Sequence, residues 1–355
     1  MRTVVLPLLI LSAAACAQQP WSIGARGHYG FLWAHRPASW ILVEGHAGAT
    51  ELFVERQVEG DRAWHRSYGM PRYGVLAVHT RMANPERIGD AINLMPYLTF
   101  PLAQGERLSF GLRVGWGVGY IAKPFDRLEN TRQIAIGSRI NGALQLMPEL
   151  RYDAGRLGLH FGLSLDHWSN GSARQPNLGL NFLSLALGAS YALGHAPPQR
   201  TVPETRGFER ERREFCVVGA FGMSESGRPL NGQYSVYVLS ADASWRMGGK
   251  GALCAGIDAF NKGDLPTVLP GLEGRSRAEL TQAGAHIGGS LLMGRGELLF
   301  HFGGYLFSPE PDDAPVYQRT GMRYRLGKHL LASVCLKTHF ATADHWEFGI
   351  GYRWN

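Results

Sequence analysis

The sequence predicts an all-β protein that crosses a bacterial outer membrane as an antiparallel β-barrel with an even number of strands. Large apolar side chains alternate with glycine and small polar residues along several segments, and the chain ends on an aromatic strand of this kind. After residue 17 no apolar run approaches the roughly 20 residues that a membrane-spanning helix needs. Charged residues make up only 18% of the chain, below the ~25% of ordinary soluble domains. The 45% hydrophobic and 11% aromatic content can bury a core, which excludes a disordered chain.

The N-terminal residues 1–17 predict a secretory signal peptide, with one basic residue, an apolar stretch and small residues before a cleavage site at Gln18. A lipoprotein site at Cys16 is the weaker alternative, because Ala13 stands where a leucine is expected. We therefore expect Sec export to the outer membrane. The mature chain then keeps Cys216, Cys254 and Cys335. Their odd number and wide spacing favour the interpretation that they act as small apolar residues on strands, and one disulfide among them is left open.

The segment from Leu108 to Tyr120 shows the barrel pattern most clearly. Every even position is large and apolar, and the odd positions are glycine apart from Ser109 and Arg113. A soluble sandwich would carry many charges on its second face, whereas a small, sparsely polar face is typical of a barrel lumen. Residues 134–146 and 346–354 repeat the alternation, and the last of these segments carries the aromatic residues of a membrane girdle, so outward residues such as Trp116 are expected to face lipid. A lipocalin-like soluble barrel, the alternative, would need polar residues on its outer face.

The predicted strands fall into two groups. We expect about eight strands within residues 18–194, and about six to eight within 213–355, which gives about 14–16 in all. Between the groups, residues 195–212 are rich in proline and charge. This segment is either a long periplasmic connection within one barrel or a linker between two barrels, and the pattern leaves both open. The net charge of +7 points only weakly to an anionic partner, and no nucleic acid is expected.

A hairpin over residues 157–193 holds the one constellation with catalytic chemistry. The period-2 geometry of strands places His167 and Ser169 on the lipid-facing side of the first strand, and Asn181 on the same side of the second. Polar groups in such positions are costly unless they are functional. A serine becomes a nucleophile when a histidine takes its proton, and an asparagine carbonyl can orient that histidine. Asp166 is adjacent in sequence but falls on the lumen face, so we exclude it as the partner.

The loop that joins these strands supplies candidates for the oxyanion hole. Asn170 and Asn177, with nearby backbone N–H groups, can hold the negative charge of a tetrahedral intermediate. With a periplasmic N-terminus, the strand that begins near residue 157 is the seventh and runs outward. Residues 171–178 then lie outside the cell, at the level of the outer leaflet. The alternative interpretation is that the polar residues merely mark the rim of the barrel.

Two adjacent motifs give the chain a specific resemblance. His167-Trp168-Ser169-Asn170-Gly171, followed by Gln175-Pro176-Asn177-Leu178-Gly179-Leu180-Asn181, resembles the lipid A 3-O-deacylase family of outer-membrane barrels. The resemblance is best for its longer members, the acyloxyacyl hydrolases of Bacteroidetes-type bacteria. It is specific only at 167–181 but extends over most of the mature chain, at residues 71–84, 123–130, 135–141, 317–324 and 336–339.

The resemblance implies an outer-membrane esterase that hydrolyses an acyl ester of lipid A, with His167 as base and Ser169 as nucleophile. The third catalytic residue is glutamate in the best-known members, and this chain has Asn181 at that place. Asn177 matches the family's oxyanion-hole asparagine. Beside it, Asn170 and Gly179 are expected at the oxyanion or the substrate, and the basic Arg174 is expected to meet lipid A phosphates. No cofactor and no metal are expected.

Two alternatives remain open. Outer-membrane phospholipase A is similar in its His-x-Ser-Asn-Gly motif and its asparagine third member, but its Ser-Arg-Ser-Trp stretch and calcium ligands have no counterpart near residues 172–181. A structural or transport barrel would use residues 167–181 only as a rim. His339, Asp344 and His345 lack the spacing of a metal motif, so we expect them at the rim or in the lumen. The oligomeric state is left open.

Overall fold

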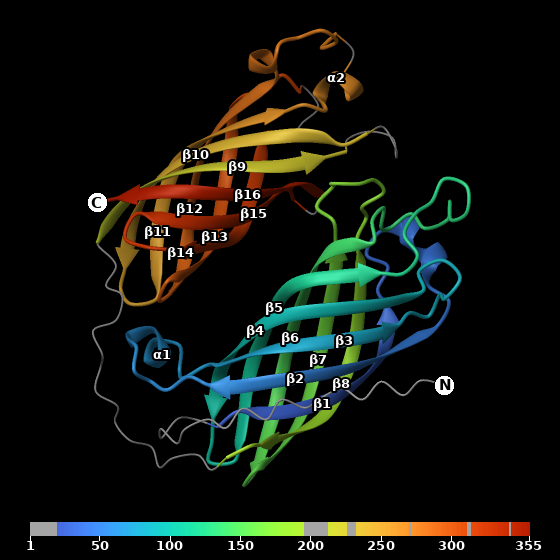
Figure 1. Cartoon of the computed structure of the whole chain (residues 1–355), viewed down its shortest axis with the longest axis vertical. Helices are drawn as coiled ribbons and strands as arrows, with labels where there is room; N and C mark the ends of the chain where they lie inside the picture. Colours follow the sequence, from blue (N-terminus) through green and yellow to red (C-terminus); the bar gives the residue numbers. More distant parts are fainter. Residues whose placement is uncertain (1–19, 195–211, 226–231, 270, 311–313, 341) are drawn as a thin grey trace, which may run out of the picture.

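The computed structural model describes residues 20–194, 212–225, 232–269, 271–310, 314–340 and 342–355. The chain forms two closed antiparallel barrels, one from β1–β8 and one from β9–β16 (Figure 1). The all-β barrel prediction is confirmed, and of the two arrangements left open, one barrel or two, the structure has two. The predicted signal peptide at 1–17 lies outside the described residues, as does all but the last residue of segment 195–212.

The first barrel closes where β1 pairs with β8, with Ser22 opposite Ala192. Its strands are β1 (Ser22–Leu32), β2 (His46–Gln57), β3 (Arg72–Arg81), β4 (Asp90–Gln104), β5 (Leu108–Ile121), β6 (Ile140–Ala154), β7 (Leu157–Ser169) and β8 (Leu180–Ala192). A 3₁₀ helix, η1 (Pro37–Leu42), follows β1, and a short helix, α1 (Ala63–Ser67), lies between β2 and β3.

The second barrel closes where β16 pairs with β9, with Phe348 opposite Phe221. Its strands are β9 (Arg213–Ser224), β10 (Tyr234–Met247), β11 (Gly251–Lys262), β12 (Thr281–Met293), β13 (Gly296–Phe307), β14 (Val316–Arg325), β15 (Leu330–His339) and β16 (Thr342–Trp354). The helix α2 (Leu265–Val268) and the 3₁₀ helix η2 (Arg277–Leu280) lie in the loop between β11 and β12. No helix in the described parts of the chain is long and apolar enough to cross a membrane.

The strands alternate between an apolar outer face and a polar lumen, as the period-2 pattern predicts. On β7, Phe161 and Leu163 are exposed on the outside, whereas His160 and Ser164 beside them are buried. One detail differs from the expected pattern. β6 begins only at Ile140, because the preceding residues fold into a loop in which Ile136 bridges to Asn177. The favoured interpretation of the cysteines is confirmed: Cys216, Cys254 and Cys335 are buried on strands and free, so no disulfide forms among them.

Buried ion pairs fill both lumens. In the first barrel Arg113 is fully buried and bonds Glu51 at 2.9 Å, and the same Glu51 pairs with Arg26. In the second barrel Arg319 lies 2.5 Å from Glu347 and 2.7 Å from Asp258. Removing one partner of such a pair strands a charge in a water-poor interior, which costs about 3–5 kcal/mol. The interior of each barrel is therefore filled with paired side chains, and the strands that carry the rim residues are rigid.

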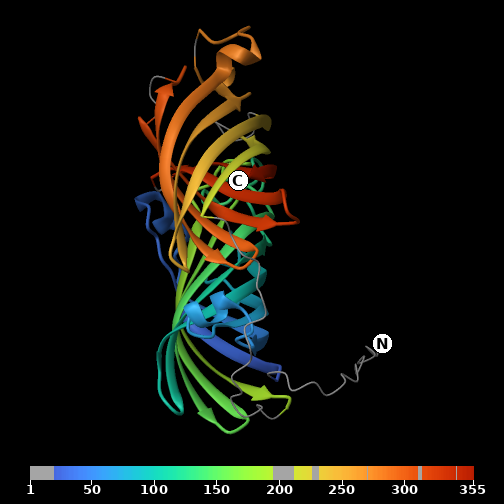
Figure 2. The same ribbon diagram turned by 90° about the vertical axis from the view of Figure 1, so that its left-hand side faces the viewer.

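The two barrels contact each other at both ends, turn end against turn end and loop end against loop end. At the end with short turns, the Tyr68 hydroxyl after α1 donates to the carbonyl of Lys250 at 3.0 Å. At the end with long loops, the backbone N–H of Glu225 donates to the carbonyl of Ser172 at 2.8 Å. The barrels thus lie side by side with their turns at one end and their loops at the other (Figure 1 and Figure 2). Such an arrangement lets a single membrane hold both.

One pair of tryptophans joins the walls between these ends. Trp116 of β5 stacks on Trp346 of β16, with ring centroids 5.8 Å apart and an interplanar angle of 24°. The period-2 pattern predicts that Trp116 points out of the first barrel, and it does, but toward a second barrel rather than toward lipid. The expectation that it faces lipid is wrong, because no local pattern indicates which part of the outer wall a neighbouring barrel covers.

Candidate active site

The candidate site lies at the loop end of the first barrel, where β7 ends and β8 begins. The β7–β8 register places His167 directly opposite Asn181. Both side chains leave the barrel on its outer side, while the neighbouring Asp166, Trp168, Leu180 and Phe182 are buried in the lumen. The structure thus agrees with the exclusion of Asp166, which bonds Ser164 and Gln145 inside the barrel.

A chain of three polar side chains orients His167. Its Nδ1 lies 2.6 Å from the side-chain oxygen of Asn181, and the Asn181 amide nitrogen lies 2.6 Å from Nδ1 of His35. The amide nitrogen can only donate, so it donates to His35, and the amide oxygen therefore accepts the Nδ1–H of His167. This tautomer leaves Nε2 of His167 without a proton, in the form that a general base needs. His35, in the loop after β1, is a member that period-2 reasoning missed because it precedes Asn181 by 146 residues.

Ser169 is 8% exposed and sits among groups that can donate hydrogen bonds. Its Oγ lies 3.0 Å from the side-chain nitrogen of Asn177 and 3.2 Å from the backbone N–H of Gly171. Within the described residues no hydrogen bond joins Ser169 to His167, although the two share a strand face two positions apart. Catalytic contacts of this kind are often loose without substrate and tighten when it binds.

Gly179 makes room for the histidine. Its φ is +79°, and a Cβ at this position would lie 2.8 Å from Cε1 of His167. Any other residue would therefore be strained and would push the imidazole out of place. Gly179 also donates its N–H to the carbonyl of Ala135 at 3.1 Å, which ties the start of β8 to the loop between β5 and β6.

The other two residues expected at the substrate differ in their surroundings. The Asn170 side-chain nitrogen donates to Ser138 Oγ at 3.0 Å and to the Arg174 carbonyl at 2.9 Å. These bonds engage both protons of the Asn170 amide nitrogen and hold the 170–179 loop in shape. The side chain of Arg174 is exposed at the tip of the loop, where it is open to an anionic group.

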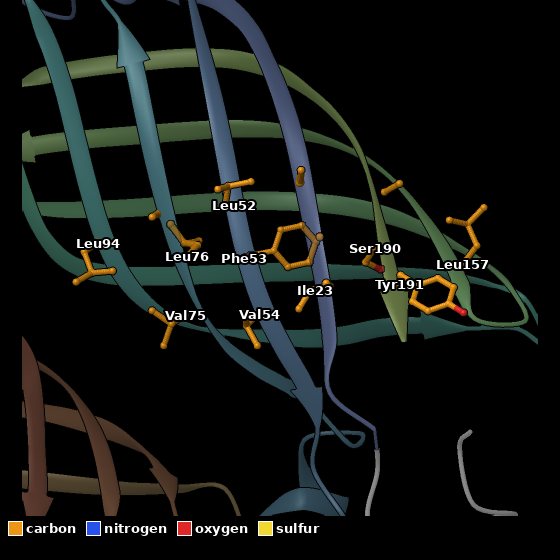
Figure 3. A pocket seen from close by; sticks show the side chains of 14 residues that line it. Ile23, Leu52, Phe53, Val54, Val75, Leu76, Leu94, Leu157, Ser190 and Tyr191 are labelled. Atoms are coloured by element: carbon orange, nitrogen blue, oxygen red, sulfur yellow. The ribbon is translucent and has the colours of Figure 1, made fainter. Parts of the chain in front are cut away.

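A hollow on the wall of the first barrel lies away from the candidate site. It measures about 660 Å³ and is formed by β1–β4 with β7 and β8 (Figure 3). Most of its lining is apolar and outward-facing, for example Ile23, Leu52 and Leu94, which are 47%, 60% and 60% exposed. Leu157 and Tyr191 place it at the turn end of β7 and β8, whereas Ser169 and Asn181 lie at the loop end. This hollow is a feature of the lipid-facing wall and not of the candidate site.

Two family models match nearly the whole chain. Residues 15–190 match lipid A 3-O-deacylase (PagL), and residues 213–355 match the acyloxyacyl hydrolase C-terminal domain. The chain belongs to the lipid A 3-O-deacylase family. This membership makes it a carboxylic-ester hydrolase and implies lipid A as its substrate. The family and the barrel fold are together consistent with an outer-membrane location.

Comparisons with individual proteins are less informative. Curated protein sequences gave no match. Among solved structures, a mutant of the Rh. blastica porin aligns with 94% of this deacylase chain and 100% of its own, at 9% identity and a TM-score of 0.22. A triple mutant of the Rhodopseudomonas blastica porin gives the same coverage at 10% identity and a TM-score of 0.20. Scores this low add nothing to the strand topology described above.

Proposed function

We propose that this deacylase cleaves an acyl ester of lipid A with Ser169 as nucleophile, His167 as general base and Asn181 as the residue that orients His167. The observation that carries the proposal is the His35–Asn181–His167 chain, because it fixes the one tautomer of His167 that can accept the serine proton. The family supports the deacylation itself, and the 3-position ester is the bond its description names.

The reaction proceeds in two halves. Ser169 Oγ attacks the ester carbonyl carbon while its proton moves to Nε2 of His167, and the C–O bond to the sugar breaks as that proton passes to the leaving sugar oxygen. Water then gives a proton to His167 and attacks the acyl-serine, which releases the fatty acid and restores Ser169. In each half the carbonyl oxygen carries a negative charge. The Asn177 amide nitrogen and the Gly171 N–H, both beside Ser169 Oγ, are placed to hold it.

The substrate reaches this site from the membrane and not through the barrel. Side chains fill the lumen of the first barrel, whereas His167 and Asn181 lie on its outer side, in line with exposed leucines such as Leu163 and Leu185. A lipid in the outer leaflet can therefore diffuse sideways until its ester meets Ser169. The exposed Arg174 is placed to bind a lipid A phosphate as the acyl chain lies along the wall.

The approach comes from one side. On the β6 side, Trp346 of the second barrel covers Gly142 and Gly171. On the β1 side, the exposed Trp33 lies beside Gly179 and Asn181 and offers an apolar surface. The acyl chain consequently approaches along β8 and β1.

The test is a mass spectrum of lipid A incubated with the purified full chain and with the Ser169→Ala variant. The wild type should remove one ester-linked acyl chain, and the variant should leave lipid A intact while folding normally. Phospholipid as the preferred substrate, with activity lost to a calcium chelator, would instead support the phospholipase alternative. Unchanged lipid A with wild-type protein that is fully folded would contradict the proposal.

A further inference from the structure

A cluster of three potential metal ligands lies inside the second barrel. Cys254 of β11, His286 of β12 and His301 of β13 are buried on three neighbouring strands, and one ligand atom from each lies within 4.8 Å of the others. Both histidines are 3% exposed. The Nε2 atoms of both rings are buried and have no hydrogen-bond partner among the described residues. Two unsatisfied imidazole nitrogens beside a buried thiol are costly unless something binds them.

The surroundings of His286 resemble the support that metal ligands receive in proteins. Its Nδ1 lies 2.7 Å from a carboxylate oxygen of Asp258, which fixes the ring and leaves Nε2 for a ligand bond. The ring lies over Gly256, where a Cβ would approach Cε1 to 2.7 Å and Nε2 to 2.8 Å. Gly256 is the inward position between Cys254 and Asp258 on β11. The glycine therefore allows one ring to reach both the carboxylate on one side and the thiol on the other.

The charges near the cluster are already paired. Arg319 bonds Glu347 and Asp258, and Arg323 forms two bonds with Asp242, at 3.0 and 2.8 Å. No uncompensated guanidinium thus opposes a cation at this level of the described barrel. The cluster also lies close to the short-turn end of the lumen, because Cys254 is three residues from the start of β11.

We propose that Cys254, His286 and His301 bind a zinc-type divalent cation in the lumen of the second barrel. One thiolate and two imidazoles form a donor set that Zn²⁺ favours, with water as a fourth ligand. Tetrahedral zinc would hold these ligand atoms roughly 3.3–3.7 Å apart. Side-chain rotations that bring the ligand atoms about 1 Å closer together would therefore form the site. On binding, the Cys254 thiol loses its proton to solvent. The ion would cross-link β11, β12 and β13 and stabilise a barrel whose described cysteines form no disulfide.

Cobalt absorption spectroscopy on the chelator-treated full chain in detergent micelles tests this site. We expect one Co²⁺ per chain, with a thiolate-to-metal band in the near ultraviolet, the intense visible bands of a four-coordinate ion, and loss of both on adding Zn²⁺. Cys254→Ser should abolish the ultraviolet band. His301→Gln should weaken Co²⁺ binding and serves as the second variant if Cys254→Ser folds poorly. The matched control is Cys335→Ser, which removes another buried cysteine of the same barrel and should keep both bands.

Two results would overturn the metal site. One is a folded wild-type chain without the thiolate band. The other is equal loss of that band in Cys335→Ser and Cys254→Ser. Heat-modifiable migration on gels confirms in each case that the barrels are folded.

A separate set of contacts links the second barrel to the candidate active site. The buried Glu225, after β9, accepts the backbone N–H of Gln175 at 2.8 Å and donates its own N–H to the carbonyl of Ser172 at 2.8 Å. Ser172 Oγ donates to the carbonyl of Ala343 at 2.6 Å. The second barrel therefore holds the loop between Ser169 and Asn177 by hydrogen bonds from two of its own segments.

Trp346 completes this contact. A Cβ on Gly171 would lie 2.3 Å from Cδ1 of Trp346, so the indole packs directly on the backbone of Gly171. Gly171 adopts a φ of +63° and is the residue whose N–H points at Ser169 Oγ. Displacing the indole would free this peptide group to turn.

We infer, on the basis of the proposed function, that Glu225 and Trp346 are positioning residues that hold the Gly171 N–H and Asn177 at the oxyanion. Deleting an oxyanion donor costs about 10²–10³-fold in kcat. Loosening two donors without deleting them should cost less, about tenfold. The loss should fall on kcat and not on KM, because the donors act on the charge that develops in the transition state.

Kinetics of lipid A deacylation by Glu225→Ala and Trp346→Ala test the inference. Both variants should lower kcat with KM little changed, and Glu225→Gln, which keeps an acceptor oxygen, should restore most of the rate. Trp354→Ala is the matched control, since it removes an exposed tryptophan from the other end of β16 and should be silent. Wild-type kcat in both variants would overturn the positioning role. Failure of the proposed function is distinguishable, because Ser169→Ala would then stay active.

Discussion

The sharpest prediction concerns Asn181, the residue proposed to orient His167. Asn181→Ala removes the 2.6 Å hydrogen bond that orients His167 and leaves the imidazolium of the transition state without a partner. A hydrogen bond to a charged group contributes about 1.5–3 kcal/mol. At about 1.36 kcal/mol for each factor of ten, kcat/KM should fall about 10- to 150-fold. The remaining activity should still exceed that of His167→Ala.

The isosteric change Asn181→Asp supplies the missing charge in nearly the same place. The new carboxylate would accept from His167 and stabilise its cation, and the exposed His35 would change tautomer to donate to the second oxygen. Activity should therefore equal or exceed that of the wild type, and Asn181→Glu should behave in the same direction. Fatty acid released from lipid A, quantified by mass spectrometry, measures all of the variants. If Asn181→Asp lost as much as Asn181→Ala, or if Asn181→Ala stayed fully active, the orienting role would be refuted.

The same geometry supports three further predictions. Ser169→Ala and His167→Ala should each lose almost all deacylation, and the double variant should lose little more, because the two act as one unit; additive losses would argue against this. Leu163→Arg places a charge on the exposed face in the middle of β7 and should destabilise the folded barrel by about 2–4 kcal/mol in urea titrations in bilayers, whereas unchanged stability would mean that this face is not in lipid. A cysteine at the exposed Arg174 should react with an impermeant thiol reagent on intact cells, and absence of labelling would reverse the predicted direction of β7.

Much of the fold follows from one local property of the sequence. Side chains on a strand alternate between two faces, so the segment Leu108–Tyr120 could be assigned to a barrel wall from its alternation alone. The same rule placed His167 and Asn181 outside and Asp166 inside, as the structure has them. It failed at Ile134 and Ile136, where the alternation is present but the chain folds into a loop. Burial beneath the 170–179 loop, not strand pairing, makes Ile136 apolar.

The remaining features depend on which segments meet, and no local pattern reports that. His35 lies on the loop after β1, and it reaches Asn181 only because β8 pairs with β1 when the barrel closes. Cys254, His286 and His301 are separated by 32 and 15 residues, a spacing unlike a metal motif, yet three adjacent strands bring them together.

Contact between the two barrels determines the surroundings of some outward aromatic residues, which a local pattern does not predict. Trp116 and Trp346 both carry the pattern of lipid-facing residues, and only the second barrel makes them partners. In a chain with two barrels, an outward aromatic residue can therefore face lipid or pack against the other barrel. Glycines on the opposite wall distinguish the second case. Gly171 and Gly142 leave space that Trp346 fills, whereas an aromatic residue facing lipid needs no such space.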